Sequence, residues 1–356
     1  MRCSSMQSPG QKLYQPDRRS FLQQGCSALG TLAGLGAGLP VLAQTVTPTV
    51  TPVVAPTSVE QLHMLCSGPP GSIPDIVARR VAEHMGGKYA QRITVENRPG
   101  AAGQIAVTAL KSAPADGSTI LLAQGAVATA YPYLYAKLAY DPVLDLQPVS
   151  TAGEMTLALA IGPAVPESVR TLADFIDWMR RNPKLANVAS PGTGTLPHLL
   201  EAMLFRAVDV PWQHIVYSGG PPAMTDLLGG QIAALVLPEG LFRQHKASGR
   251  LRVLATSGAT RSTYFPDVPS LVELGHPNLV VREWFAFFMA ARVPTATITS
   301  ASEALRAAIA RPELVAAFAD SGMQATSSTP AALASRIAAE QRYWQPLISA
   351  SGIRAE

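Results

Sequence analysis

The loop at residues 189–198, with the sequence Ala-Ser-Pro-Gly-Thr-Gly-Thr-Leu-Pro-His, has the residue types needed to bind an anion. A β-like run precedes it and a run with helical apolar spacing follows, which predicts a strand, a turn and a helix start. Its two glycines let the backbone approach a ligand closely, and the helix start adds unpaired N–H groups and a positive dipole end. Such a site needs no lysine or arginine. An ordinary strand-to-helix connection is the alternative interpretation.

One pair in this loop, Ser190 with His198, could act as a nucleophile and its base, which would make the protein a hydrolase. No third, orienting residue is marked for this pair. The chain after residue 43 has no Gly-x-Ser-x-Gly elbow, His-Glu-x-x-His pair, Cys-x-x-Cys pair or complete dinucleotide fingerprint. We therefore expect no catalytic residues, no metal and no cofactor.

Three further loops of small residues follow predicted strands, at 67–75, 124–129 and 218–222. Predicted strands alternate with predicted helices along the chain, which is typical of an α/β fold with a mostly parallel sheet. Ligands of such sheets bind outside the carboxyl ends of the strands, where all four loops are expected.

The first 43 residues have the pattern of a secretory signal. A twin arginine, Arg18-Arg19, is followed by a weakly hydrophobic run and a small-residue site ending at Ala43. We expect export to the periplasm by the Tat route, with cleavage after Ala43. Residues 44–58, rich in Thr, Val and Pro, are expected to form a flexible linker.

Removal of the signal changes the charge of a chain that has 356 residues and a formal net charge of +4. Four basic residues and one acidic residue lie in the signal, so the mature part has a net charge of +1 and nucleic acid is not an expected partner. Only Cys66 remains of the three cysteines, so no internal disulfide can form.

Several motifs, in order, resemble the Bug/TctC family of periplasmic receptors for tripartite tricarboxylate transporters. The first half carries Pro70-Gly71, Glu96-Asn97-Arg98-Pro99-Gly100-Ala101 and Pro114-Ala115-Asp116-Gly117. The second half carries the 190–198 loop, Tyr217-Ser218-Gly219-Gly220-Pro221-Pro222 and Pro266-Asp267-Val268-Pro269. The likeness extends over residues 60 to 353.

This resemblance implies a two-lobed periplasmic-binding-protein-like fold with a ligand cleft between the lobes. Residues 59–155 plus 284–356 would form lobe 1, and residues 156–283 would form lobe 2. The lobes would close on a small carboxylate about two crossings, near Gly153–Thr156 and Val280–Trp284. Expected ligand-binding residues are Gly71, Ser72, Ile73, Asp75, Gln124 and Ala126 in lobe 1, and Ser190, Gly192, Thr193, Gly194, Thr195, His198, Tyr217, Gly219 and Glu239 in lobe 2.

Two departures from the family pattern concern the ligand. The loop at 70–75 has Ser72 where a second glycine is usual, and Glu239 stands where many members have an aspartate that can contact a ligand amine. The second departure argues against an amino-acid ligand. The expected protein is a monomeric receptor that serves membrane transporter subunits, or a ligand sensor for a histidine kinase.

Overall fold

The computed structural model describes residues 58–351 and 353–355. The chain divides into two compact units, Met1–Pro52 and Val53–Glu356, and every described residue belongs to the second. The predicted signal peptide and the predicted linker lie outside the described residues, apart from Ser58. None of the helices in the described part is long and apolar enough to span a membrane.

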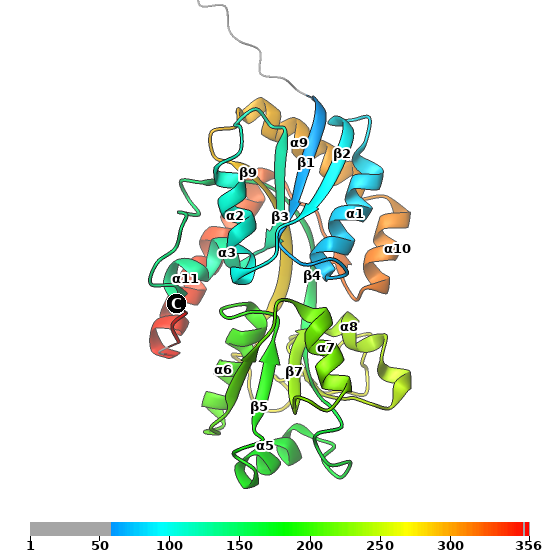
Figure 1. Ribbon diagram of the computed structural model, residues 1–356, viewed down its shortest axis with the longest axis vertical. Coiled ribbons are helices and arrows are strands. Elements are labelled where there is room, and N and C mark those ends of the chain that lie inside the picture. The colour runs from blue at the N-terminus through cyan, green and yellow to red at the C-terminus, as the bar shows by residue number, and fades with distance from the viewer. Residues whose placement is uncertain (1–57, 352, 356) are drawn as a thin grey trace, which may run out of the picture. The chain divides into compact units, whose positions relative to one another are not determined.

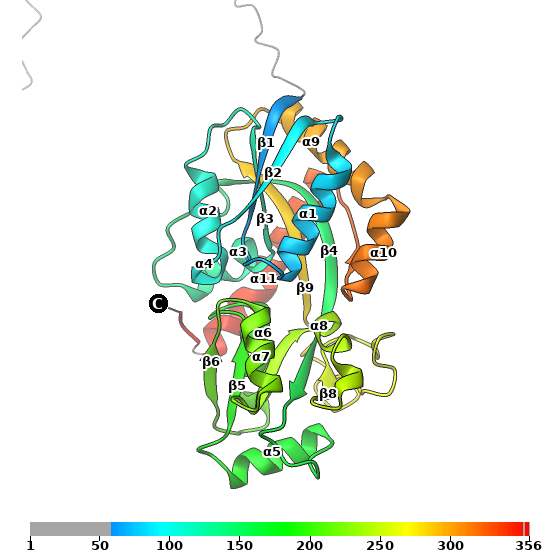
Figure 2. The same ribbon diagram turned by 45° about the vertical axis from the view of Figure 1, so that its right-hand side comes forward.

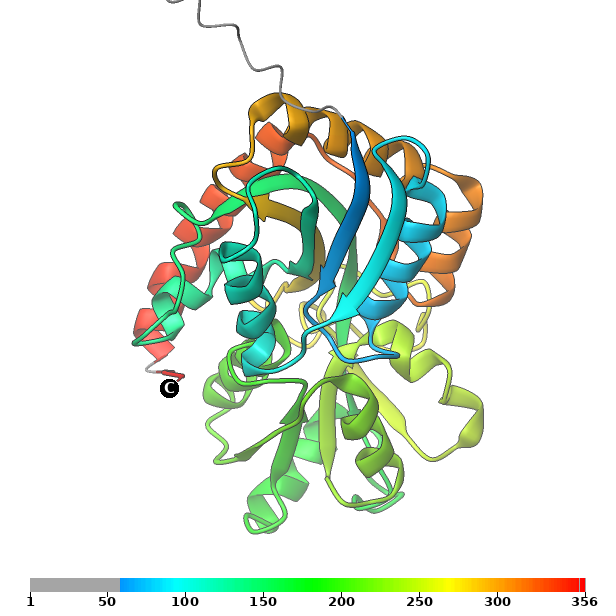
Figure 3. The same ribbon diagram turned by 45° about the horizontal axis from the view of Figure 1, so that its top comes forward.

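The first lobe contains a sheet in which three parallel strands lie next to two antiparallel ones (Figure 1). Strand β1 (Val59–Cys66) pairs in parallel with β2 (Ala90–Asn97) and with β3 (Thr119–Gln124). Strand β9 (Arg282–Ala290) then pairs antiparallel with β3 and with β4 (Leu146–Ile161). Figure 3 shows the three parallel strands running toward the second lobe, so their carboxyl ends face it.

Helices cover both faces of this sheet (Figure 2). One buried cluster unites α1 (Ile73–Met85), α9 (Thr295–Ile309) and α10 (Pro312–Asp320) with the sheet. On the other face lie α2 (Gln104–Lys111) and α11 (Pro330–Ser351). The shorter elements of this lobe are the 3-10 turn at Ala101–Gly103, α3 (Ala126–Thr129), α4 (Tyr131–Leu134) and β10 (Gln324–Ala325).

The second lobe repeats the parallel arrangement with fewer strands. Strand β5 (Asn187–Ser190) lies between β6 (Gln213–Val216) and β7 (Ala234–Pro238), parallel to both. The carboxyl-terminal part of β4 pairs antiparallel with β7 and β8 (Arg252–Thr256). Its helices are α5 (Leu172–Arg181), α6 (Leu196–Ala207), α7 (Gly220–Leu228) and α8 (Glu239–Arg243), with a 3-10 turn at Lys246–Ser248.

Strand β4 belongs to both lobes. Its residues from Leu146 to Thr156 pair with β9, and those from Leu157 to Ile161 pair with β7. The predicted α/β, two-lobed fold is confirmed, but the sheet is mixed rather than mostly parallel because β4 and β9 run against their neighbours. The two predicted crossings are paired with each other there, with Glu154 opposite Trp284. The predicted lobe boundaries and the hinge stay predictions.

Prolines mark the starts of three helices. Pro74, Pro197 and Pro221 lie in the first turns of α1, α6 and α7. Proline is favoured there because its missing N–H is not needed by the helix and its φ is already helical. Each of these helices follows the carboxyl end of a parallel strand, β1, β5 or β6.

Candidate functional site

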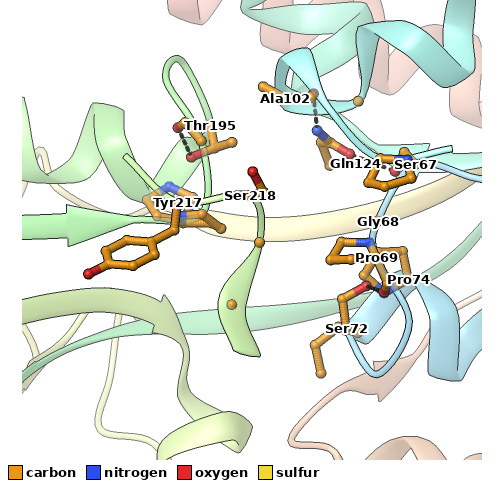
Figure 4. A pocket seen from close by; sticks show the side chains of 18 of the residues that line it. Ser67, Gly68, Pro69, Ser72, Pro74, Ala102, Gln124, Thr195, Tyr217 and Ser218 are labelled. Atoms are coloured by element: carbon orange, nitrogen blue, oxygen red, sulfur yellow. Dashed lines mark hydrogen bonds between the residues drawn. The ribbon is translucent and has the colours of Figure 1, made fainter. Parts of the chain in front are cut away.

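A cavity of about 370 Å³ lies where the strand ends of the two lobes face each other. Figure 4 shows Ser67, Ser72 and Gln124 of the first lobe across from Thr195, Tyr217 and Ser218 of the second. Other parts of the wall come from 99–104, from 191–193 and from 237–238. Apolar wall is supplied by side chains that include Ile73, Leu237, Leu241 and Phe285.

Four helices begin at the wall of this cavity. The residues at the starts of α1, α2, α6 and α7 all line it, represented by Ile73, Gln104, Thr195 and Gly220. The first N–H groups of a helix have no partner within the helix, and they carry a partial positive charge. In the part of the chain that the structure describes, no lysine, arginine or histidine is among the residues that line the cavity. An anion in the cavity would therefore meet backbone N–H groups rather than cationic side chains.

The loop between β1 and α1 is held in place by Asp75. This carboxylate, 5% exposed, accepts hydrogen bonds of 2.9 Å from the Gly71 backbone N–H, from Arg79 Nε and from Asn97 Nδ2. Burial acts against the charged form, but these hydrogen bonds outweigh it and hold the pKa of Asp75 below its usual value. Asp75 is not among the residues that line the cavity, so it shapes the loop from behind.

The loop between β5 and α6 is organised by hydrogen bonds of its own. Thr195 Oγ1 donates to the Gly192 carbonyl at 2.8 Å, and the Gly194 N–H donates to His198 Nδ1 at 3.0 Å. His198 is buried, and burial together with the nearby His214 lowers its pKa to about 3. A neutral ring leaves Nδ1 free to accept this hydrogen bond at neutral pH.

The Ser190–His198 pair considered for hydrolysis does not form. Ser190 Oγ lies 2.8 Å from Nε2 of a different histidine, His214, and Ser190 is 0% exposed. Glu201 Oε2 is 4.0 Å from that same Nε2 atom. Among the described residues no carboxylate pairs with His214 Nδ1, where a hydrolase triad would need one to orient the ring. Ser190 and His198 do not line the cavity.

Side-chain hydrogen bonds also hold the 99–104 segment of the cavity wall in place. Gln124 accepts a hydrogen bond of 2.9 Å from Ser67 Oγ and donates one of 2.5 Å to the Ala102 carbonyl. Tyr131 also donates to the Ala102 carbonyl, at 2.9 Å. Ala101 and Ala102 have φ values of 45° and 50°, a conformation that alanine rarely adopts and that the surrounding hydrogen bonds maintain.

Eight of the fifteen predicted binding residues line the cavity. These are Ser72, Ile73, Gln124, Gly192, Thr193, Thr195, Tyr217 and Gly219. The structure does not bring the other seven to its wall: Gly71, Asp75, Ala126, Ser190, Gly194, His198 and Glu239. Six of these seven belong to the same loops as the wall residues, and all six except Gly71 are buried, whereas Glu239 lies elsewhere. A role in ligand contact stays a prediction for all fifteen.

Glu239 faces a different cavity. This second cavity, of about 560 Å³, is lined by residues from β4, from the 258–264 loop and from α10. Glu239 is 3% exposed, and burial raises its pKa to about 7. The cause is local: β7 ends at Pro238 and α8 begins at Glu239, so the chain turns away from the first cavity at this residue.

Several parts of the wall were not among the predicted binding residues, including the 99–104 segment, Tyr135, and the pair Glu283 and Phe285 on β9. Of these three parts, only the first had a signal, the Arg98-Pro99-Gly100 run used above for the resemblance. Glu283 is 4% exposed, and burial raises its pKa to about 8. Within residues 58–351 and 353–355, its Oε1 atom has no hydrogen-bond partner.

Known proteins share this fold and this sequence pattern. Residues 77–353 match the model of the tripartite tricarboxylate transporter family receptors. The chain is 31% identical to BugT of Bordetella pertussis over 294 residues, which is 82% of this chain and 90% of BugT. The structure of the periplasmic binding protein BugD covers 83% of this chain and 99% of its own, with 26% identity and a TM-score of 0.77. MatC from Rhodopseudomonas palustris, solved with bound malate, covers 81% and 99%, with 24% identity and a TM-score of 0.75.

The extent of the family match and the likeness to BugT together place the chain in a family of solute-binding receptors. It belongs to the tripartite tricarboxylate transporter receptors, the Bug/TctC family. At the level of the family, the protein is a solute-binding receptor and not an enzyme.

Proposed function

We propose that this receptor captures a small carboxylate in the 370 Å³ cavity and delivers it to a transporter of the tripartite tricarboxylate type. The observation that carries the proposal is the meeting of four helix starts around a cavity whose described wall has no cationic side chain. Helix N-termini bind carboxylates through their free N–H groups and their dipoles. The malate bound to MatC is a carboxylate of suitable size.

The binding mode that we propose uses the backbone at the starts of α1 and α6 for the ligand carboxylate. The hydroxyl groups of Ser72 and Thr195 already donate to carbonyls of their own loops, at 2.6 and 2.8 Å. They therefore hold the loops in shape and offer the ligand only an acceptor lone pair. Backbone N–H groups remain the principal donors to an anion.

We also propose that the protein works in the periplasm as a monomer, after export by the Tat route and cleavage behind Ala43. This proposal rests on the twin arginine and small-residue site of the sequence and on the periplasmic setting of the family. The cell fraction that contains the protein, and the N-terminal residue of the mature form, would test it.

The experiment is a thermal-shift screen of the mature chain with malate, succinate, adipate and citrate, followed by calorimetry on the acids that stabilise it. An acid at 100 times its Kd adds about 2.7 kcal/mol to the free energy of unfolding. Failure of every acid to bind would overturn the proposal. Turnover of an activated ester that disappears in the Ser190→Ala variant would do the same, because it would reveal an enzyme.

A further inference from the structure

Glu283 occupies an unusual position for an acidic residue. It lies on β9, opposite Met155 of β4, in the stretch where these two strands pair. Residues two apart on a strand share a face, and Glu283 and Phe285 both line the ligand cavity. Glu283 is the acidic residue among those that line it in the described part of the chain, and 4% of its surface is exposed.

The carboxyl group of Glu283 is not fully satisfied by the protein. Its Oε1 atom has no hydrogen-bond partner among the described residues, although buried polar groups nearly always have one. The backbone N–H of Trp284 bonds to the carboxyl group. A polar group left short of a partner at the wall of a ligand cavity is accounted for if a ligand completes its hydrogen bonding.

The groups around Glu283 favour its neutral form. Burial is the main cause of the raised pKa, the Trp284 hydrogen bond acts against it, and the charge of Glu340 on α11 adds to it. Glu340 itself accepts hydrogen bonds of 2.9 Å from Trp284 Nε1 and from Arg336 Nε. Tyr131 of α4 also interacts electrostatically with Glu283, and burial raises the pKa of its phenol well above the usual value, so it is neutral too.

We propose that Glu283 determines the specificity of this receptor by contacting the bound acid directly, as a hydrogen-bond donor. The inference rests on the proposed function, since it presupposes a carboxylate in this cavity. A protonated Glu283 can donate to a second carboxylate, a hydroxyl or a carbonyl oxygen of the ligand. An ionised Glu283 would instead repel an anion, because the described residues of the cavity wall include no cationic side chain. The ligand is thus a dicarboxylate, a hydroxy acid or an oxo acid. The second carboxylate, the hydroxyl or the carbonyl oxygen that accepts the hydrogen bond would face β9.

The test is calorimetric titration of the mature protein with L-malate, succinate, adipate and citrate between pH 6 and pH 9. For an acid that binds, a donor with a pKa of about 8 predicts affinity roughly tenfold weaker at pH 9 than at pH 6. Glu283→Gln keeps a donor, so its affinity at pH 6 should stay within about threefold of the wild type and change little up to pH 9. Glu283→Leu removes the donor and should weaken binding about threefold to tenfold.

Two controls separate an effect specific to Glu283 from the general effect of changing a buried carboxyl group or the ligand. Glu201→Gln makes the same chemical change at another buried carboxyl group, on α6 and outside the cavity wall, and should leave the pH profile unchanged. L-aspartate, which replaces the malate hydroxyl with an ammonium group, should bind the wild type more weakly than L-malate.

The inference is overturned if Glu283→Leu binds the acid as tightly as the wild type with the same pH profile. It is also overturned if Glu283→Gln loses binding while wild-type affinity rises with pH, since the ionised form would then be the binding form. Wild-type protein that binds none of the four acids would overturn the proposed function together with this inference, whereas the first two results leave the proposed function intact.

Discussion

The phenol of Tyr135, in the first lobe, donates a hydrogen bond of 2.7 Å to the backbone carbonyl of Thr193, in the second. Both residues line the ligand cavity, so this bond joins the lobes beside the place where the ligand would lie. Tyr135→Phe removes the bond and keeps the ring. A neutral hydrogen bond contributes about 0.5–1.5 kcal/mol, so we expect ligand affinity to fall about twofold to tenfold.

Calorimetry with the bound acid measures this effect, and thermal unfolding without ligand is the control that detects any loss of stability. Unchanged or tighter binding by Tyr135→Phe would contradict the expectation that this bond between the lobes supports ligand binding.

Gly194 lies at a close contact between the lobes. Its φ is +79°, and a Cβ added there would lie 2.2 Å from Leu134 Cδ2, on a side chain that is 1% exposed. Gly194→Val should therefore prevent the loop and the first lobe from meeting and should weaken binding at least about tenfold, while both lobes stay folded.

The matched control is Gly249→Val. Gly249 also has a positive φ, +64°, but a Cβ there meets nothing within 4 Å. This variant measures backbone strain alone, so its affinity should equal that of the wild type. Equal affinity of Gly194→Val and Gly249→Val would show that the contact with Leu134 does not matter for binding.

Arg98 is the conspicuous arginine of the 96–101 motif, yet it does not line the cavity. Its guanidinium is about half exposed and pairs with Glu96 at 2.7 Å. Exposed ion pairs contribute about 0–1 kcal/mol to stability. Arg98→Ala should leave ligand affinity within about twofold of the wild type in calorimetry, and loss of binding would mean that an arginine clamps the ligand after all.

Asp75 should make the folded protein sensitive to acid. Its pKa is lowered in the folded state, so its contribution to stability is present above the unfolded pKa of about 3.9 and is lost as the pH falls through the folded value. Asp75→Asn removes the charge that Arg79 and the Gly71 N–H contact, and should lower the free energy of unfolding by about 1–3 kcal/mol at pH 7.

Urea unfolding at pH 7 and near pH 3 tests this expectation. The difference between Asp75→Asn and the wild type should shrink at the lower pH, because the wild-type carboxylate is then becoming protonated. A difference that is the same at both pH values would show that the charge of Asp75 is not what holds the loop.

The parts of the fold that sequence alone predicted are local ones. The strand and helix around the 67–75 loop, and those around the 189–198 loop, are observed as β1–α1 and β5–α6. Glycine and proline residues mark these turns, and apolar residues at helical spacing mark the helices. Both signals lie within a few residues of each other in the sequence. The loops of the site could therefore be found without knowledge of tertiary contacts.

The missing parts of the site depend on pairing between distant segments. Glu283 precedes a run of apolar residues that predicts a strand, but its position at the cavity follows from β9 lying between β3 and β4, more than 120 residues earlier in the chain. Tyr135 lies in a loop with no motif of its own. Glu239 shows the opposite case, in which a position implied by resemblance faces another cavity because α8 begins there.

The measurement that tests the central claim most directly is a crystal structure of the mature protein with one of the stabilising acids bound. We expect a carboxylate of that acid in the 370 Å³ cavity, within hydrogen-bond distance of backbone N–H groups at the starts of α1 and α6, and without a lysine or arginine contact. A carboxylate held by an arginine or lysine side chain, or an acid bound in the cavity beside Glu239, would contradict the account.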